Sequence, residues 1–343
     1  MSYSNIGSDD TRRSWSEPPH IGSKYISDKS KTHPASSWRD MGVRRTFPVA
    51  LHQAKLEPWH SAKVINYSHR TASLRLSKLS ISNKRKGVRI KAKKTILSLR
   101  GTELQNPPKD PFEMTDLESL SMSPERESCL EFKLTEVPKE IKNLNNLRQL
   151  VLDTNELREI PNEISDLNQL ETLTLSNNRL AELPGGFAKL SSLRSLHLAN
   201  NRFAEFPNEI CGLVSLSFLD LSDNSIREIP DEFDWLSSTL QTLLLYINDL
   251  QRLPESFGNL TELTTLWLGK NRLESLPKSF GKLVNLDWSD FPSSSNIDEN
   301  PLKSPPLWVC QRGVSAIREY FSGNKPEKIT EERREEIELS LED

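Results

Sequence analysis

The side chains of this 343-residue chain that could do chemistry are aromatic, apolar and acidic residues at matching positions of a repeated segment. Aromatic residues clustered beside carboxylates are typical of surfaces that bind other proteins. Asp220 and nearby Asp223 are suited to orienting a basic partner. His197 is the only histidine inside the regular repeats, and we interpret it as a contact residue, not as a catalyst or metal ligand. The candidate contact residues are Phe218, Asp220, Leu244, Tyr246, Ile247, Trp267, Trp288 and His197.

A second interpretation of the same aromatic residues is open. Some of the rings could pack beneath a loop that covers the end of the repeats, in which case they would be structural. Trp288 is the main candidate for this role, because the repeat that contains it is irregular.

Catalytic and metal-binding patterns are missing from the sequence. G-x-x-x-x-G-K-[ST], H-E-x-x-H, C-x-x-C and G-x-S-x-G do not occur. The three cysteines, Cys129, Cys211 and Cys310, are scattered and do not form the disulfide clusters that cap extracellular repeat proteins. We therefore expect a non-enzymatic protein without a cofactor or a metal.

The elements that must position the contact residues are repeats of one template, L-x-x-L-x-L-x-x-N-x-[LIF]-x-x-[LIF]-P. The regular units are 23 residues apart, with one spacing of 24, and they open at Leu147, Leu170, Leu193, Leu216, Leu240 and Leu263. This is the leucine-rich repeat signature. It predicts an α/β solenoid in which each unit adds one short strand to a curved parallel sheet, whose concave face is a binding surface.

The template also predicts which side chains are structural. The leucines at its first, fourth and sixth positions point inward and stack on the next unit, and the other strand positions face the concave side because side chains alternate along a strand. The repeated asparagine is expected to pair with backbone groups that the turn leaves free. Its members are Asn155, Asn178, Asn201, Asn224, Asn248 and Asn271.

The boundaries follow from the repeats. We expect a disordered basic arm over 1–91, about nine units over 92–306, a capping helix over 307–322 and a charged tail over 323–343. Insertions make the second and last units irregular. The cap is predicted from Val309, Ala316, Ile317, Tyr320 and Phe321, which can share one helical face.

The amino-terminal arm carries its own candidate sites. Residues 1–116 hold 22 Lys and Arg against 10 Asp and Glu, whereas the remainder of the chain is acidic. The pattern R-S-x-S-x-P around Ser16 predicts a phosphorylation site that 14-3-3 proteins read. A basic patch is formed by Lys84, Arg85, Lys86, Arg89, Lys91, Lys93 and Lys94. It is a candidate nuclear import signal or a site for nucleic acid or another acidic surface, and it could equally be a solvated lead-in.

One phrase of the repeats resembles a known class. Ile160-Pro-Asn-Glu-Ile164-Ser-Asp-Leu167 and Leu276-Pro-Lys-Ser-Phe280-Gly-Lys-Leu283 resemble the intracellular Ras-suppressor class of leucine-rich repeats, to which Scribble-type scaffolds and the repeat arms of Roco proteins are similar. The ending from Asn300-Pro to Gly313-Val-Ser-Ala is also similar to that class. The resemblance spans residues 92–321.

The resemblance implies a scaffold or adaptor in intracellular signalling, with a small GTPase or phosphatase complex as partner. A substrate-targeting adaptor that acts in trans for an enzyme, such as a ubiquitin ligase or phosphatase, is the alternative, and binding to nucleic acid through the basic arm is a third. The start of the chain has no apolar signal core, and no apolar run is long enough to span a membrane. We therefore expect a cytoplasmic protein, with the nucleus open to it through the basic patch.

Overall fold

The computed structural model describes residues 95–99, 106–107, 109–124, 132–289 and 294–324, together with the backbone of Val64–Asn66. The remainder of the predicted arm, the tail beyond residue 324, Ser16 and the whole basic patch of 84–94 lie outside the described residues.

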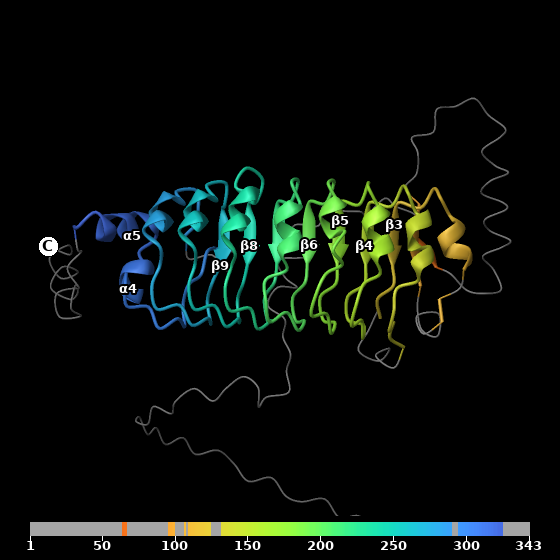
Figure 1. Ribbon diagram of the computed structural model, residues 1–343, viewed down its shortest axis with the longest axis horizontal. Helices are drawn as coiled ribbons and strands as arrows, with labels where there is room; N and C mark the ends of the chain where they lie inside the picture. Colours follow the sequence, from red (N-terminus) through yellow and green to blue (C-terminus); the bar gives the residue numbers. More distant parts are fainter. Residues whose placement is uncertain are drawn as a thin grey trace, which may run out of the picture. The chain divides into compact units, whose positions relative to one another are not determined.

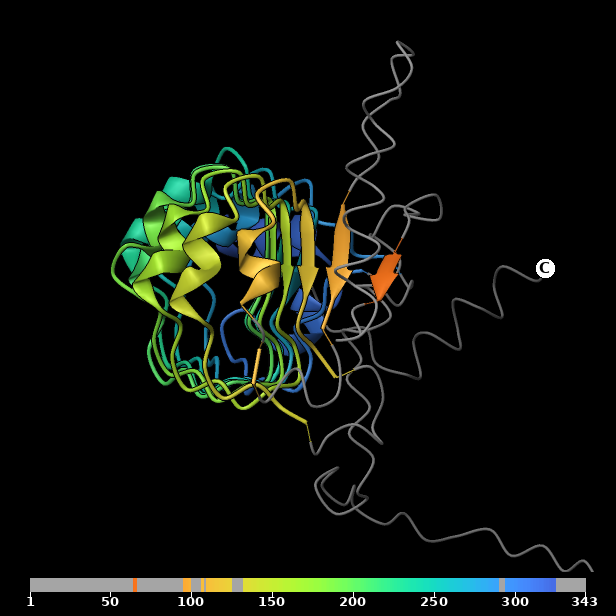
Figure 2. The same ribbon diagram turned by 90° about the vertical axis from the view of Figure 1, so that its right-hand side faces the viewer.

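The described strands form one parallel sheet of nine, in which sequential strands are neighbours (Figures 1 and 2). Each strand is only three residues long and pairs in register with the next. One strand, β1, comes from the segment that we predicted to be an arm. The strands are β1 (Val64–Asn66), β2 (Ile96–Ser98), β3 (Ser119–Ser121), β4 (Gln149–Val151), β5 (Thr172–Thr174), β6 (Ser195–His197), β7 (Phe218–Asp220), β8 (Thr242–Leu244) and β9 (Thr265–Trp267).

Short 3-10 helices cover the side of the repeats opposite the sheet (Figure 2). Most follow the template proline, whose ring holds φ near −65°. The ψ of this proline is extended, so the helix begins only at the next residue, as after Pro161 (φ −66°, ψ 148°). The helices are η2 (Asp110–Glu113), η4 (Lys139–Asn143), η5 (Asn162–Asp166), η6 (Phe187–Lys189), η7 (Asn208–Gly212), η8 (Asp231–Leu236), η9 (Glu255–Asn259) and η10 (Lys278–Lys282).

The core lies between the strands and the 3-10 helices. Leu216, Leu219 and Leu221, the three template leucines of one unit, are all 0% exposed. Burial of each such leucine contributes about 1.5–3 kcal/mol, and contacts with the neighbouring units are part of that burial. On the helix side, Phe257 stacks on Phe280 with ring centroids 6.3 Å apart. The predicted inward positions are therefore confirmed.

The repeated asparagine has the structural role that we predicted. Asn224 is typical: its Nδ2 donates to the carbonyls of Leu198 at 3.1 Å and Leu221 at 3.0 Å, and its Oδ1 accepts from the backbone N–H of Phe203 at 3.1 Å. One amide therefore joins two successive units and pairs backbone groups that the turn leaves free. Asn300 extends this ladder into the irregular last unit, where it accepts from the N–H of Leu273 at 3.0 Å.

Two helices close the carboxyl-terminal end, α4 (Leu307–Cys310) and α5 (Val314–Phe321). The sequence predicted one helix, but the chain breaks at Gly313, whose φ of 88° is strained for any residue with a side chain. Val309 and Ile317 are fully buried, and Arg318 Nε donates to the carbonyl of Gly281 at 2.9 Å, so the cap is fastened to η10. Within the described residues, no helix has the length and apolar character needed to cross a membrane.

Candidate protein-binding face

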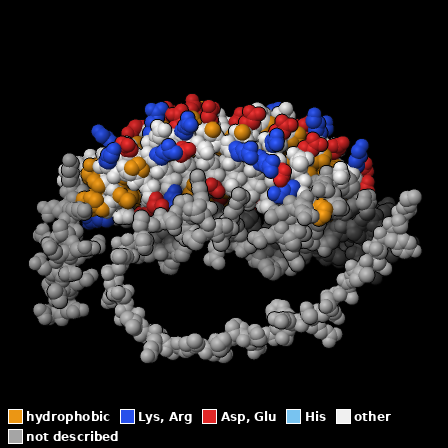
Figure 3. Space-filling view, turned by 90° about the horizontal axis from the view of Figure 1, so that it is seen from below, with side chains coloured by type: hydrophobic (Ala, Val, Ile, Leu, Met, Phe, Trp, Pro, Cys, Tyr) orange, Lys and Arg blue, Asp and Glu red, His pale blue; other side chains and the backbone are white. Residues whose placement is uncertain are grey.

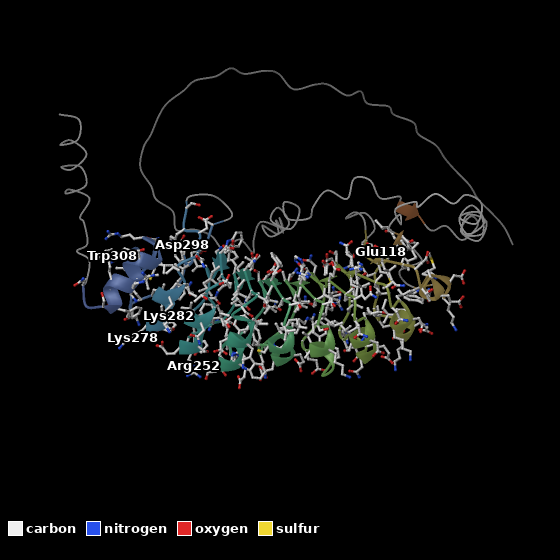
Figure 4. All side chains as sticks on the ribbon, turned by 90° about the horizontal axis from the view of Figure 1, so that it is seen from above. Glu118, Arg252, Lys278, Lys282, Asp298 and Trp308 are labelled. Carbon is white, nitrogen blue, oxygen red and sulfur yellow. The ribbon has the colours of Figure 1, made fainter. Side chains whose placement is uncertain are left out.

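We call the surface formed by the outward side chains of β4–β9 and the residues just after them the strand face. It lies opposite the 3-10 helices (Figure 4). The strand register places four of the predicted contact residues in one row, because His197 pairs with Asp220, Asp220 with Leu244 and Leu244 with Trp267. The structure therefore brings together side chains that are 70 positions apart in the sequence.

This row is buried, which corrects the prediction that it faces solvent. His197 is 6% exposed, Asp220 2%, Leu244 0% and Trp267 7%. For Trp267 the cause is direct. The irregular last unit crosses the end of the sheet, where Asn296 bridges to Trp267, and the indole Nε1 donates to the carbonyl of Ser294 at 2.7 Å. A segment of the last unit thus covers this ring.

Trp288 does not belong to the strand face. Its ring lies against the carboxyl-terminal cap, where a Cβ on Gly313 would sit 3.4 Å from the indole Cγ, and it packs on the buried core. Both Trp267 and Trp288 are therefore held by the end of the repeats, in agreement with the second interpretation of these rings. The extra residues of the last unit indicated that a segment could cover these rings, but the sequence did not show where that segment runs.

Among the predicted contact residues of the strand face, the accessible ones are Phe218 and Tyr246, which are half-buried, and Ile247, which is 37% exposed. Tyr246 meets Trp267 edge-on, with ring centroids 6.2 Å apart. It also lies against Gly269, where an added Cβ would be 3.0 Å from the tyrosine Cε2. The glycine therefore makes room for the tyrosine ring.

Lys270, which we did not predict as a contact residue, lies beside these accessible side chains. The Lys270 Nζ lies 5.5 Å from the centroid of the Tyr246 ring and 3.5 Å from a carboxylate oxygen of Glu299. Burial lowers the pKa of Lys270, but the hydrogen bond to Tyr246 and the charge of Glu299 outweigh it, so the pKa is raised and the amine stays charged. We name Tyr246, Ile247 and Lys270, together with Phe218 of the neighbouring strand β7, the aromatic cluster. Lys270 occupies the same template position as Ile247, so the repeat pattern could have identified it as a contact residue.

Carboxylates with raised pKa values lie on the amino-terminal side of this cluster. Burial raises the pKa of Asp220 to about 6, even though the backbone N–H of Ser222 donates to its Oδ1 at 2.9 Å. Burial likewise raises the pKa of Asp153 to about 6, and the nearby charge of Asp220 adds to the effect. In the same region His197 Nε2 lies 2.8 Å from Ser195 Oγ, and its ring centroid is 4.5 Å from that of Phe218. Close packing of this kind suits contact rather than bond-making chemistry.

The described side chains do not form a metal site. They contain no group of three or more His, Cys, Asp or Glu residues placed to hold a metal ion. Cys211 and Cys310 are buried free thiols, and burial raises their pKa values to about 11 and about 12. Raised thiol pKa values oppose formation of the reactive thiolate.

The repeats match known family models. Residues 120–210 match a model described as a leucine-rich repeat region, and residues 215–236 and 262–283 match the leucine-rich repeat itself. No curated protein matches the chain. With the solenoid described above, these matches support a leucine-rich repeat protein, whose repeats form a protein-interaction scaffold. They do not distinguish the Ras-suppressor, Scribble-type and Roco-arm classes, so that resemblance stays a prediction.

Solved structures similar to this chain include a leucine-rich repeat protein of Leptospira interrogans, with 36% identity and a TM-score of 0.54 over 60% of this chain and 49% of that one. A TDR receptor has 26% identity and a TM-score of 0.50 over 61% and 35%. A plant peptide hormone receptor, solved in complex with RGF2, has 26% identity and a TM-score of 0.49 over 61% and 32%. The chain thus spans about half the length of the first and about a third of the two receptors.

Proposed function

We propose that this protein is a non-catalytic scaffold that binds a protein partner through the aromatic cluster of the strand face. The observation that carries the proposal is the conformation of Ile247, a β-branched residue with φ of 57° that is also 37% exposed. The left-handed region is a genuine outlier for a β-branched residue.

Seven units adopt this conformation at the same template position, and only one of them has isoleucine there. The residues at the same template position have φ between 52° and 62°, and they are Thr154, Asn177, Asn200, Asp223, Lys270 and Glu299. Asparagine adopts this region readily, whereas for most other residues with a side chain the left-handed conformation lowers the stability of the folded state by about 1–2 kcal/mol. An exposed isoleucine here therefore costs stability in the free protein, and a contact with a partner compensates for that cost.

The cluster favours a partner of defined chemistry. Phe218, Tyr246 and Ile247 present apolar and aromatic surface, which a protruding apolar side chain of the partner can cover. The Lys270 amine lies over the ring of Tyr246 with Glu299 beside it, so a polar group of the partner can fix the orientation. The resemblance noted above makes a small GTPase or phosphatase complex in the cytoplasm the first candidate. A ubiquitin-ligase or phosphatase adaptor would use the same surface.

Affinity purification from the native cell type with mass spectrometry tests the proposal. The full chain is compared with Ile247→Asn and Tyr246→Ala, and with Val284→Ala as the control, because Val284 is 60% exposed but lies after η10 on the opposite side of the repeats. We expect one set of proteins to disappear with Ile247→Asn and Tyr246→Ala only.

Loss of folding cannot mimic that result for Ile247→Asn, because removal of the strained isoleucine should raise the free energy of unfolding by about 1 kcal/mol. If all partners remain with both variants, the strand face is not the binding site. Ligase or phosphatase subunits among the lost proteins would favour the adaptor role, and a GTPase would favour the signalling scaffold.

A further inference from the structure

A second exposed aromatic residue lies on the opposite side of the repeats, at the end of η8. Trp235 is 66% exposed, while its helix neighbours Phe233 and Leu236 fill the core at 1% and 0%. The fold does not require a tryptophan there, because the fifth residue after the template proline is polar or glycine elsewhere. Those residues are Asn143, Asp166, Lys189, Gly212, Asn259 and Lys282.

The charged residues of the helix that carries Trp235 and of its two neighbouring helices are all acidic. The three consecutive helices η7, η8 and η9 contain five carboxylates and no lysine or arginine. The next helix, η10, contains two cations, Lys278 and Lys282, which lie toward the carboxyl-terminal end (Figure 4). The carboxylates of Glu232, Glu209 and Asp234 also converge in space, since all three add to the effect of burial in raising the pKa of the Cys211 thiol between them.

Some carboxylates elsewhere on the surface are engaged by cations. Along the side of the repeats shown in Figure 3, acidic and basic side chains lie next to one another. Ion pairs join neighbouring units, as between Arg252 and Glu228 at 2.9 Å and between Arg272 and Asp249 at 2.7 Å.

In η7 and η8, by contrast, Glu209, Asp231, Glu232 and Asp234 form no ion pair with a described residue. Two of them are held by neutral donors instead, Asp231 by Ser256 Oγ at 3.2 Å and Asp234 by Asn259 Nδ2 at 3.0 Å. They are therefore positioned while their charge stays available.

We propose that the surface formed by Trp235 and these four carboxylates of η7 and η8 docks an arginine-rich segment of a second protein. An exposed indole attracts a guanidinium to its face, and tryptophan is the strongest of the aromatic residues in this interaction. Neighbouring arginines of the segment pair with the carboxylates, and the absence of cations from η7, η8 and η9 removes competing repulsion. Together with the strand face, this site would let the scaffold hold two partners on opposite sides.

Fluorescence anisotropy with labelled octa-arginine and the full-length chain tests this site. Trp235→Ala should raise the dissociation constant at least about tenfold, as loss of an aromatic hot spot does. Asp231→Asn with Asp234→Asn should weaken binding and flatten its dependence on salt. Octa-lysine should bind less tightly than octa-arginine, because a guanidinium stacks on an indole better than an ammonium does.

Two control variants separate this site from general attraction to an acidic protein. Val284→Ala removes an apolar side chain that is 60% exposed but lies beside the lysines of η10, and Glu163→Gln removes a carboxylate of η5. Both should leave the dissociation constant within about twofold of the wild-type value. Circular dichroism should be recorded for every variant to check that all fold alike.

Three results would overturn the proposal. Trp235→Ala could bind octa-arginine as tightly as the wild type does, or Glu163→Gln could weaken binding as much as the η8 variants do. The third concerns the chain's own basic patch. If conversion of Lys84, Arg85, Lys86 and Arg89 to glutamine raises the affinity for octa-arginine about tenfold or more, the patch itself occupies the site and a second protein is not its partner.

Discussion

Replacement of Asp220 by asparagine should make the protein more stable at neutral pH. Burial raises the pKa of this carboxyl from 3.8 to about 6, and its side chain is 2% exposed. A difference of about two pKa units corresponds to about 3 kcal/mol between the protonated and ionised forms, which is the upper limit of the effect. Asparagine keeps an oxygen that can accept from the N–H of Ser222 and removes the charge.

The sign of the pH dependence follows from the raised pKa. The folded protein binds this proton more tightly than the unfolded chain does, so the stabilising contribution is fully present below about pH 4. It is lost as the pH rises through about 6, where Asp220 ionises in the folded state. The difference in stability between Asp220→Asn and the wild type should therefore be small at pH 4 and reach its maximum above pH 7.

Urea unfolding followed by circular dichroism at several pH values between 4 and 8 measures this difference. Asp231→Asn is the control, because it changes an exposed carboxyl of η8. Asp153 contributes in the same pH range, and its own pKa should fall when the charge of Asp220 is removed. The reasoning is refuted if Asp220→Asn is as stable as the wild type, or less stable, at pH 7.5.

Three further changes test the packing of the repeats. Leu219→Ala, at a fully buried position, should cost about 2–5 kcal/mol, and a melting temperature equal to that of the wild type would contradict the register. Asn224→Ala leaves the buried N–H of Phe203 unpaired at about 1–3 kcal/mol, whereas the carbonyls of Leu198 and Leu221 still accept from Asn201 and Asn248, so chemical denaturation should show a loss in that range. Gly269→Ala places a Cβ 2.2 Å from Asn296 Oδ1, so we expect the segment over Trp267 to shift and hydrogen exchange at residues 294–296 to rise; unchanged exchange would show that the segment adapts without moving.

The sequence by itself was sufficient to predict the solenoid and its core. Each unit contacts chiefly its neighbours, so a template that repeats every 23 residues determines the strand, the turn and the inward leucines locally. The roles of Asn224 and of the template prolines follow from the same local geometry. The resemblance to the Ras-suppressor class adds a functional expectation, which stays a prediction.

The tertiary structure decided which side chains of the strand face are accessible. Alternation along a strand tells which way Trp267 points, but not what lies above it, because the covering residues Ser294–Asn296 come from an insertion outside the repeat period. The left-handed φ of Ile247 could not be read from its residue type, which disfavours that conformation. The position of Trp235 also depended on the structure, because only the packing of η8 shows that Phe233 and Leu236 fill the core and leave the indole outside.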